Sequence, residues 1–212
     1  MKVSESLTQK FFDRHAMVAQ NRDVTARHIR KNELDKYASD FATVYNKAWA
    51  GHGGMKEIKT EMVKKMFRQM KPVMDEKVIW FVYDKNEPIA MWVNLPDLNQ
   101  WFKYLDGKFN LVSKLKFLWI KKTKKCRKFT GLVFGIVPEW QGKGIDSFMI
   151  VEGAKIIQGE NLYDDYEMQW IGEFNPKMVN IATSLGTQRS RTLATYRYIF
   201  DRTKEFREHP VV

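Results

Sequence analysis

The sequence predicts a mixed α/β (α+β) domain in which helices cover both faces of a central sheet. Near the middle of the chain, KVIWFVYD and PIAMWVNL flank a polar turn at residues 85–87, which indicates a β-hairpin. Predicted strands and helices then alternate, a pattern typical of layered sheets. With 212 residues, 44% of them hydrophobic, the chain is long enough for one compact domain with a buried core.

The elements before the hairpin follow from the spacing of apolar residues. Residues 1–26 show no clear period and are expected to form an N-terminal extension or an incomplete element, to which no function is assigned. Residues 26–30 predict a first strand, and residues 33–49 carry apolar side chains at helical spacing. The glycines of GHGG at 51–54 predict a loop, and a second helix is expected over about 57–74.

After the hairpin, residues 96–128 interrupt the pattern and are predicted to be an insertion. The insertion is expected to hold a short helix around 97–105, a turn at Asp106 and Gly107, and a basic, aromatic helix around 112–122. The remaining elements are predicted to alternate, as strand 129–137, helix 145–158, strand 167–174, helix 176–185 and strand 192–202.

The connection between strand 129–137 and the next helix has the features of a phosphate-binding loop. Pro138 ends the strand, and Gly142 and Gly144 allow the backbone to approach a ligand closely. Unpaired N–H groups and the dipole at a helix N-terminus favour an anion there, and Lys143 adds a cation. The same spacing also fits a tight connection without a ligand. Neither of the two common nucleotide-binding glycine motifs is present.

The segment VPEWQGKGI resembles the acetyl-CoA loop of the GNAT (GCN5-related N-acetyltransferase) superfamily, Val-x-Pro-Glu-Tyr-Arg/Gln-Gly-x-Gly-Ile-Gly/Ala. Gln141 stands at the Arg/Gln place, and Asp146 departs from the usual Gly or Ala. The register continues through EMQWIGEF to Asn175 and to the pair Leu185-Gly186. The resemblance spans residues 27–201 and extends to a poorly characterised bacterial branch of the superfamily.

This resemblance implies a GNAT-like domain over 27–212 with a mostly antiparallel central sheet, and acetyl-CoA or another acyl-CoA as the cofactor. In the family an amine attacks the thioester directly. The backbone of Ile136 and Val137 would polarise the thioester carbonyl and pair with the pantetheine arm, and Asn175 would face that arm. The residues implied to cradle the diphosphate are Gln141, Gly142, Lys143, Gly144 and Ile145.

The acid and base of the reaction are less clearly marked. The family often has a tyrosine on the helix after the asparagine, where this chain has Ala182. Tyr196 or Tyr198, on the last predicted strand, could replace it as the acid. Glu173, at a predicted strand end, is the first candidate for the general base, directly or through water, and His52 is the second. Each also fits a surface, capping or core role, and no metal site is expected.

Three functions remain open. The leading prediction is an acyl-CoA-dependent N-acyltransferase with an unidentified small or amphiphilic amine acceptor. The second is a GNAT-fold protein that binds CoA or an acyl metabolite without chemistry, which Asp146 and Ala182 favour. The third is a nucleic-acid or anionic-membrane binding module, because the net charge of +11 is concentrated in residues 114–128, which hold no acidic residue. Those cations also fit a solvated connection or the nucleotide end of CoA.

The cellular compartment is predicted from absences in the sequence. The single cysteine, Cys126, excludes an internal disulfide, and the N-terminus lacks the apolar core of a signal peptide. No apolar run approaches the roughly 20 residues needed to span a bilayer. A cytoplasmic protein that contacts membranes at most peripherally is therefore expected.

Overall fold

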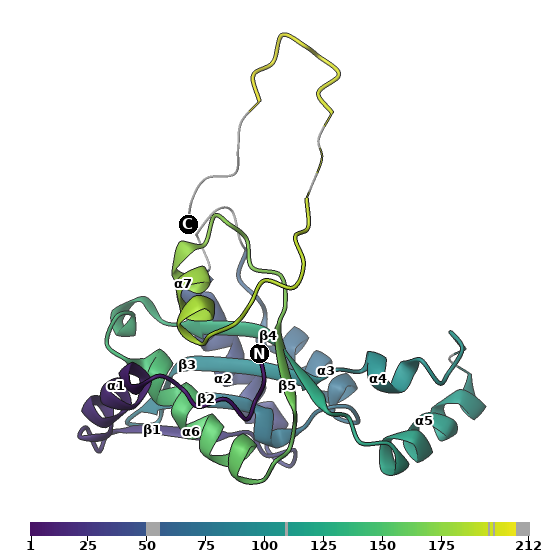
Figure 1. The fold of residues 1–212 in the computed structure, drawn as a ribbon, viewed down its shortest axis with the longest axis horizontal. Coiled ribbons are helices and arrows are strands. Elements are labelled where there is room, and N and C mark those ends of the chain that lie inside the picture. The colour runs from purple at the N-terminus through teal and green to yellow at the C-terminus, as the bar shows by residue number, and fades with distance from the viewer. Residues whose placement is uncertain (50–55, 109, 195, 197, 207–212) are drawn as a thin grey trace.

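The computed structural model describes residues 1–49, 56–108, 110–194, 196 and 198–206, which form a five-stranded sheet with helices on both faces (Figure 1). The strands lie in the sheet in the order of the sequence. Their bounds are β1 (Val24–His28), β2 (Ile79–Asp84), β3 (Glu87–Pro96), β4 (Lys128–Ile136) and β5 (Asp165–Met168). The first four strands pair antiparallel, and β5 pairs parallel to β4. The prediction of a mixed, mostly antiparallel sheet is confirmed, as is the hairpin β2–β3.

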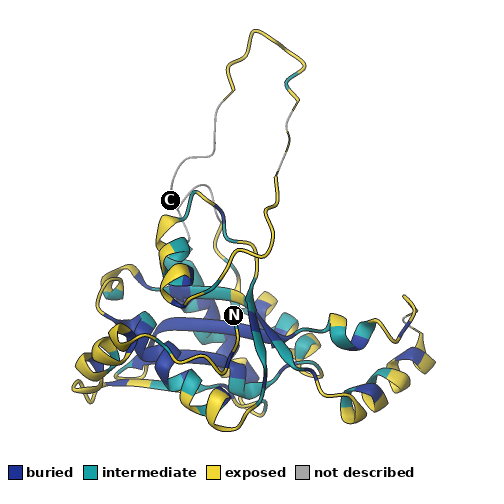
Figure 2. Ribbon diagram, viewed as in Figure 1, coloured by how far each residue is buried: buried dark blue, intermediate teal, exposed yellow. Residues whose placement is uncertain are grey.

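Two layers of helices sandwich this sheet. Helices α2 (Leu34–Trp49) and α3 (Thr60–Met70) lie on one face, and α6 (Ile145–Gly159) and α1 (Gln9–Ala19) lie on the other (Figure 1). β2 and β3 are almost entirely buried because helices cover them on both sides (Figure 2). Trp80 and Trp92 of these strands pack on Gly153 of α6, where any side chain would collide with the indole of Trp92.

The insertion forms an arm that projects from the body (Figure 1). It consists of α4 (Asn99–Phe102) and α5 (Leu111–Thr123), as the sequence predicts. Asp106 and Gly107, in the connection between these helices, have φ values of 51° and 70°. The side chain of Asn110 accepts a hydrogen bond from the N–H of Ser113 at 2.9 Å and so caps α5.

The N-terminal residues differ from the prediction. Helix α1 lies within the region expected to lack a regular element, and it packs along α6 through Phe11 and Val18. Its apolar stripe is narrow, which explains why the sequence pattern did not reveal it. β1 also begins two residues before the predicted strand, and α3 is shorter at both ends than the predicted helix.

The C-terminal third holds two corrections. The strand predicted over 167–174 ends at Met168, because β4 bulges at the neighbouring position and leaves the later residues without a partner. The strand predicted over 192–202 is absent from the described residues of that segment, which extends from the body after α7 (Pro176–Ser184) (Figure 1). The outer edge of β5 is already paired: Val3 donates to Asp164 at 2.8 Å and Tyr166 to Met1 at 3.0 Å. A β-prone segment needs a free sheet edge to form a strand.

Candidate functional site

The loop between β4 and α6 presents backbone N–H groups at the start of a long helix. After the short helix η2 (Pro138–Trp140), Gly142 and Gly144 have φ values of +75° and +82°. Only glycine adopts this left-handed region without strain. Gly144 is the N-cap residue of α6 and has no side chain that could accept a hydrogen bond from the first N–H groups of the helix. Among the described residues, no acceptor bonds the N–H groups of residues 142–145; Gly142 and Lys143 are exposed, and Gly144 and Ile145 are buried. This arrangement can hold a phosphate group.

Gln141 differs from its predicted role in one respect. Its backbone N–H, expected to face a diphosphate, donates instead to the carbonyl of Pro138 at 3.2 Å. Its side-chain Nε2 donates to the carbonyl of Ile136 at 3.1 Å, and its Oε1 accepts from Lys177 Nζ at 3.3 Å. Gln141 therefore ties the end of β4 to α7 and fixes the shape of the loop.

The charges around the loop are mainly positive. Lys143 is exposed, with Nζ 5.2 Å from the ring centroid of Trp140, and Lys177 reaches the loop from α7. The carboxylate of Asp146 lies 3.9 Å from Arg14 of α1. The acid that departs from the expected motif is thus paired with a cation, which reduces its repulsion of a bound anion.

The sheet opens beside this loop, where β4 and β5 separate. β5 pairs with β4 only over residues 128–131, and the last hydrogen bond joins the N–H of Gln169 to the carbonyl of Gly131 at 2.9 Å. The pairing of β3 with β4 skips Leu132, which marks a β-bulge in β4. A bulge bends its strand and is common next to functional sites. In the described part of the chain, no strand pairs with residues 132–136 on the β5 side.

The backbone of β4 beyond the bulge faces this opening at alternate residues. The N–H of Val137 donates to the carbonyl of Ile89 at 2.9 Å, so it is not free to polarise a thioester as predicted. Because hydrogen-bonding direction alternates along an antiparallel pair, the N–H groups of Phe134 and Ile136 point toward the opening. Ile136 therefore remains a candidate for the predicted backbone contact, and Phe134 joins it.

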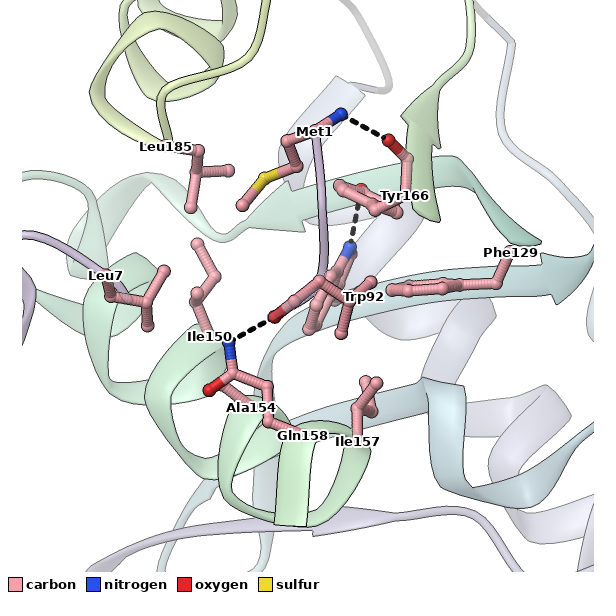
Figure 3. A pocket seen from close by; sticks show the side chains of 11 residues that line it. Met1, Leu7, Trp92, Phe129, Ile150, Ala154, Ile157, Gln158, Tyr166 and Leu185 are labelled. Atoms are coloured by element: carbon pink, nitrogen blue, oxygen red, sulfur yellow. Dashed lines mark hydrogen bonds between the residues drawn. The ribbon is translucent and has the colours of Figure 1, made fainter. Parts of the chain in front are cut away.

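An apolar cavity of about 50 Å³ lies between the N-terminal segment (Met1, Val3 and Leu7), α6 and the paired part of β4 and β5 (Figure 3). The ring of Tyr166 covers Gly131 so closely that a Cβ there would lie 2.3 Å from the phenol oxygen. Tyr166 accepts a hydrogen bond from Trp92 Nε1 at 3.1 Å, and its burial raises the pKa of the phenol. The lining side chains include Trp92, Phe129, Ile150, Ala154, Ile157, Tyr166 and Leu185.

Glu173 and Tyr196, predicted as base and acid, are both exposed to solvent. Glu173, expected at a strand end, lies in an exposed turn before α7, 3.7 Å from Arg189. Tyr196, expected on a strand, is 93% exposed in the C-terminal segment. Asn175 caps α7, with Oδ1 accepting from the N–H of Met178 at 3.1 Å. His52 lies outside the described residues.

Glu167 of β5 is a charged residue near the opening that the sequence analysis did not single out. It binds Lys128 of β4 and, at 2.5 Å, Arg191 of the C-terminal segment. Hydrogen bonds from Lys128 and then Arg191 lower the pKa of Glu167 to about 2. A carboxylate with so low a pKa is a weak base, so Glu167 serves as an ionic link between three segments. No sequence motif marks this residue, because its partners are distant in the chain.

Comparison with solved structures identifies the fold. An aminoglycoside acetyltransferase from an uncultured soil metagenomic sample, in complex with sisomicin, matches with a TM-score of 0.54 and 10% identity over 85% of this chain and 99% of that one. AAC(6')-Iy in complex with the bisubstrate analogue CoA-S-monomethyl-acetylneamine matches with a TM-score of 0.50 and 10% identity, over 83% and 98% of the two chains. The fold is that of the GNAT acetyltransferases.

The sequence comparisons are more distant. No protein-family profile matches the chain. Among curated proteins, the bacterial ceramide synthase of Caulobacter vibrioides (strain NA1000 / CB15N) is 23% identical over 177 residues. The match covers 82% of this chain and 46% of that protein. The GNAT-fold chain thus spans a little under half the length of this relative.

Proposed function

We propose that the chain is an N-acyltransferase that takes its acyl group from acyl-CoA. The main observation in support is the row of unpaired N–H groups at residues 142–145, located where β4 and β5 separate in a GNAT fold. Lys143 and Lys177 add positive charge at the same place. A diphosphate bound there would direct the pantetheine arm along the open side of β4. A solved protein of the same fold holds a CoA-containing bisubstrate analogue.

In the proposed reaction, the amine nitrogen attacks the thioester carbonyl carbon, the carbon–sulfur bond breaks, and the amine loses a proton as the thiolate gains one. The N–H groups of Phe134 and Ile136 face the opening and would hydrogen-bond the acyl-CoA. Preorganised dipoles of this kind stabilise a developing oxyanion, and a fixed acyl donor brings the amine and thioester together. Glu173 and Tyr196 are both exposed, so positioning is the main contribution that we assign to the protein.

We propose an amphiphilic amine as the acceptor and an acyl group longer than acetyl as the donor. The named relative is a ceramide synthase, and a ceramide is the fatty amide of a long-chain amino alcohol. The apolar cavity, about 50 Å³ in volume and lined by Ile150, Ala154 and Tyr166, is suited to a few carbons of a hydrocarbon chain rather than to a polar group (Figure 3).

The test is a transfer assay with the purified chain. Acyl-CoA donors of increasing chain length are combined with a panel of amines that runs from polyamines to long-chain amino alcohols. Free thiol release is measured, and the product is identified by mass spectrometry. The proposal predicts thiol release that depends on the amine and an N-acyl product. Rapid thiol release without an amide product would indicate hydrolysis and contradict it.

A second candidate function is binding of CoA or an acyl metabolite without transfer. Three observations favour it: Ala182 replaces the usual tyrosine, Glu173 is paired with Arg189, and Tyr196 is exposed. This candidate predicts saturable CoA binding by calorimetry together with no amide product for any donor and amine in the panel. Absence of both binding and transfer would contradict both candidates.

A further inference from the structure

Helix α5 is apolar on two opposite sides, and only one of them is covered. Its inner side packs on α4, where Phe117 lies 6.0 Å from Trp101 and 5.7 Å from Phe102 between ring centroids, and Ile120 is buried. Trp101 Nε1 also donates to the carbonyl of Lys124 at 2.9 Å. An amphipathic helix normally turns its apolar side toward the protein core, so the exposed apolar side of α5 requires an explanation.

The exposed side forms one continuous surface. At 3.6 residues per turn, its apolar members fall on adjacent rows of the helix. We call this surface the outer stripe; it consists of Leu111, Val112, Leu115, Leu118 and Trp119. Each of these side chains is more than half exposed, and Figure 2 shows the helix exposed along its length. Single exposed apolar side chains are common, but five on one side of a short helix indicate an interaction surface.

The charges next to the outer stripe are mainly positive; one acidic side chain, Asp106, lies 3.9 Å from Lys116. By helical geometry, Lys114 and Lys116 flank the stripe, and Lys122 lies within its row. Residues 107–138 contain no Asp or Glu. Lysine can bury its methylene groups beside an apolar surface while its ammonium reaches an anionic layer. An apolar stripe with tryptophan, bordered by lysines, has the composition of helices that lie in the interface of anionic membranes.

We propose that the outer stripe of α5 docks on an anionic lipid surface, with the helix lying in the plane of the membrane. The arm projects from the body, so the helix can reach a flat surface while the sheet and the glycine loop stay in water (Figure 1). Lys121 bonds the carbonyl of Pro72, which fixes the helix to the body. Among the helices of the described residues, none has the length and apolar character needed to span a bilayer. The proposed membrane contact does not depend on the proposed acyltransferase activity.

The experiment is vesicle co-sedimentation of the full chain. Vesicles of phosphatidylcholine alone are compared with vesicles of equal parts phosphatidylcholine and phosphatidylglycerol. The proposal predicts binding to the mixed vesicles that weakens as salt is added. Leu115→Glu is expected to reduce this binding more than about tenfold, since a carboxylate would enter the apolar layer. Lys122→Gln is expected to reduce it about fivefold.

Met62→Glu on α3 is the matched control, because Met62 and Leu115 are each 62% exposed and both changes alter the net charge equally. It should bind vesicles nearly as the unchanged protein does, and circular dichroism checks that all variants fold. If Leu115→Glu and Met62→Glu lost vesicle binding equally, the loss would be an effect of net charge, and the proposal would be overturned. So would binding to duplex DNA or RNA but not to vesicles, or a dimer in solution that Leu115→Glu disrupts while vesicles remain unbound.

Discussion

At the scale of single residues, Gly142 is the position where backbone conformation and the proposed ligand are most directly connected. Its φ is +75°, and a Cβ added there would meet no atom within 4 Å. Any effect of a side chain at this position on the folded protein therefore comes from backbone strain and from contact with a ligand. The neighbouring Gly144 differs, because its Cβ would approach Val18 of α1 at 3.3 Å.

We predict that Gly142→Ala weakens CoA binding at least about tenfold and lowers the free energy of unfolding by about 1 kcal/mol. Gly107→Ala is the matched control, since Gly107 has φ +70° and equally open surroundings but lies in the arm. It should lose similar stability and keep its affinity for CoA. Calorimetric titration and urea unfolding measure the two quantities. Equal affinities for the two variants would contradict the proposed role of the loop.

Glu167 gives a residue-scale prediction about pH. Its pKa is about 2 in the folded protein, below the value of about 4.3 for an unperturbed glutamate. A depressed pKa means that its stabilising contribution is complete above the unfolded value and is lost as the pH falls toward 2. Glu167→Gln should therefore lower the free energy of unfolding by on the order of 2 kcal/mol at pH 7. The difference should shrink below about pH 4; a difference that persists unchanged there would show that charge is not its cause.

The residue-scale features that were predictable from the sequence are those set by neighbours in the chain. Pro138, Gly142 and Gly144 locate the loop because each specifies a local backbone geometry. The positions of Glu173 and Tyr196 depended instead on where strands end, and strand ends depend on distant partners. The same is true of Glu167, whose ionic partners lie on β4 and in the C-terminal segment.

At the scale of elements, α6 joins the loop, the cavity and the core. Its N-terminus presents the unpaired N–H groups, Ile150 and Ala154 line the cavity, and Gly153 allows it to approach β2 and β3. The apolar pattern predicts this helix correctly, since its long buried face gives a strong period. α1 was missed because only Phe11 and Val18 of its residues are buried.

Close packing of α6 on the sheet predicts opposite effects at its two glycines. A Cβ at Gly153 would lie 2.9 Å from the ring of Trp92, whereas one at Gly159 meets nothing within 4 Å. Gly153→Leu should lower the free energy of unfolding by about 1–3 kcal/mol. Gly159→Ala should raise it by about 0.5 kcal/mol, because alanine favours the helix. Thermal unfolding measures both, and a stable Gly153→Leu protein would contradict the packing described for α6.

The cavity predicts selectivity for acyl length if it receives the acyl chain. Ala154→Phe would fill the space between α6 and Tyr166. The variant should use long-chain acyl-CoA about tenfold less efficiently, by kcat/KM, while its use of acetyl-CoA stays nearly the same. Transfer assays with the two donors give this ratio. An equal decrease in kcat/KM for both donors would indicate that the acyl chain binds elsewhere.

At the scale of the whole molecule, the opening between β4 and β5 results from pairings that no local pattern reveals. The bulge at Leu132 turns β4 away from β5, and residues 1–3 occupy the outer edge of β5. The predicted C-terminal strand has a suitable composition, but residues 1–3 already occupy the outer edge of β5. The hairpin and the layered architecture were predictable because adjacent segments form them, whereas the strand ends around the site depend on contacts across the fold.

The central claim is that the amides of residues 142–145 bind the diphosphate of CoA. It is tested most directly by the backbone amide resonances of ¹⁵N-labelled protein during separate titrations with CoA and with pantetheine, which lacks the diphosphate. We predict that the resonances of Gly142, Lys143, Gly144 and Ile145 shift with CoA and hardly change with pantetheine. Unshifted loop resonances at saturating CoA, or equal shifts with both compounds, would contradict the account.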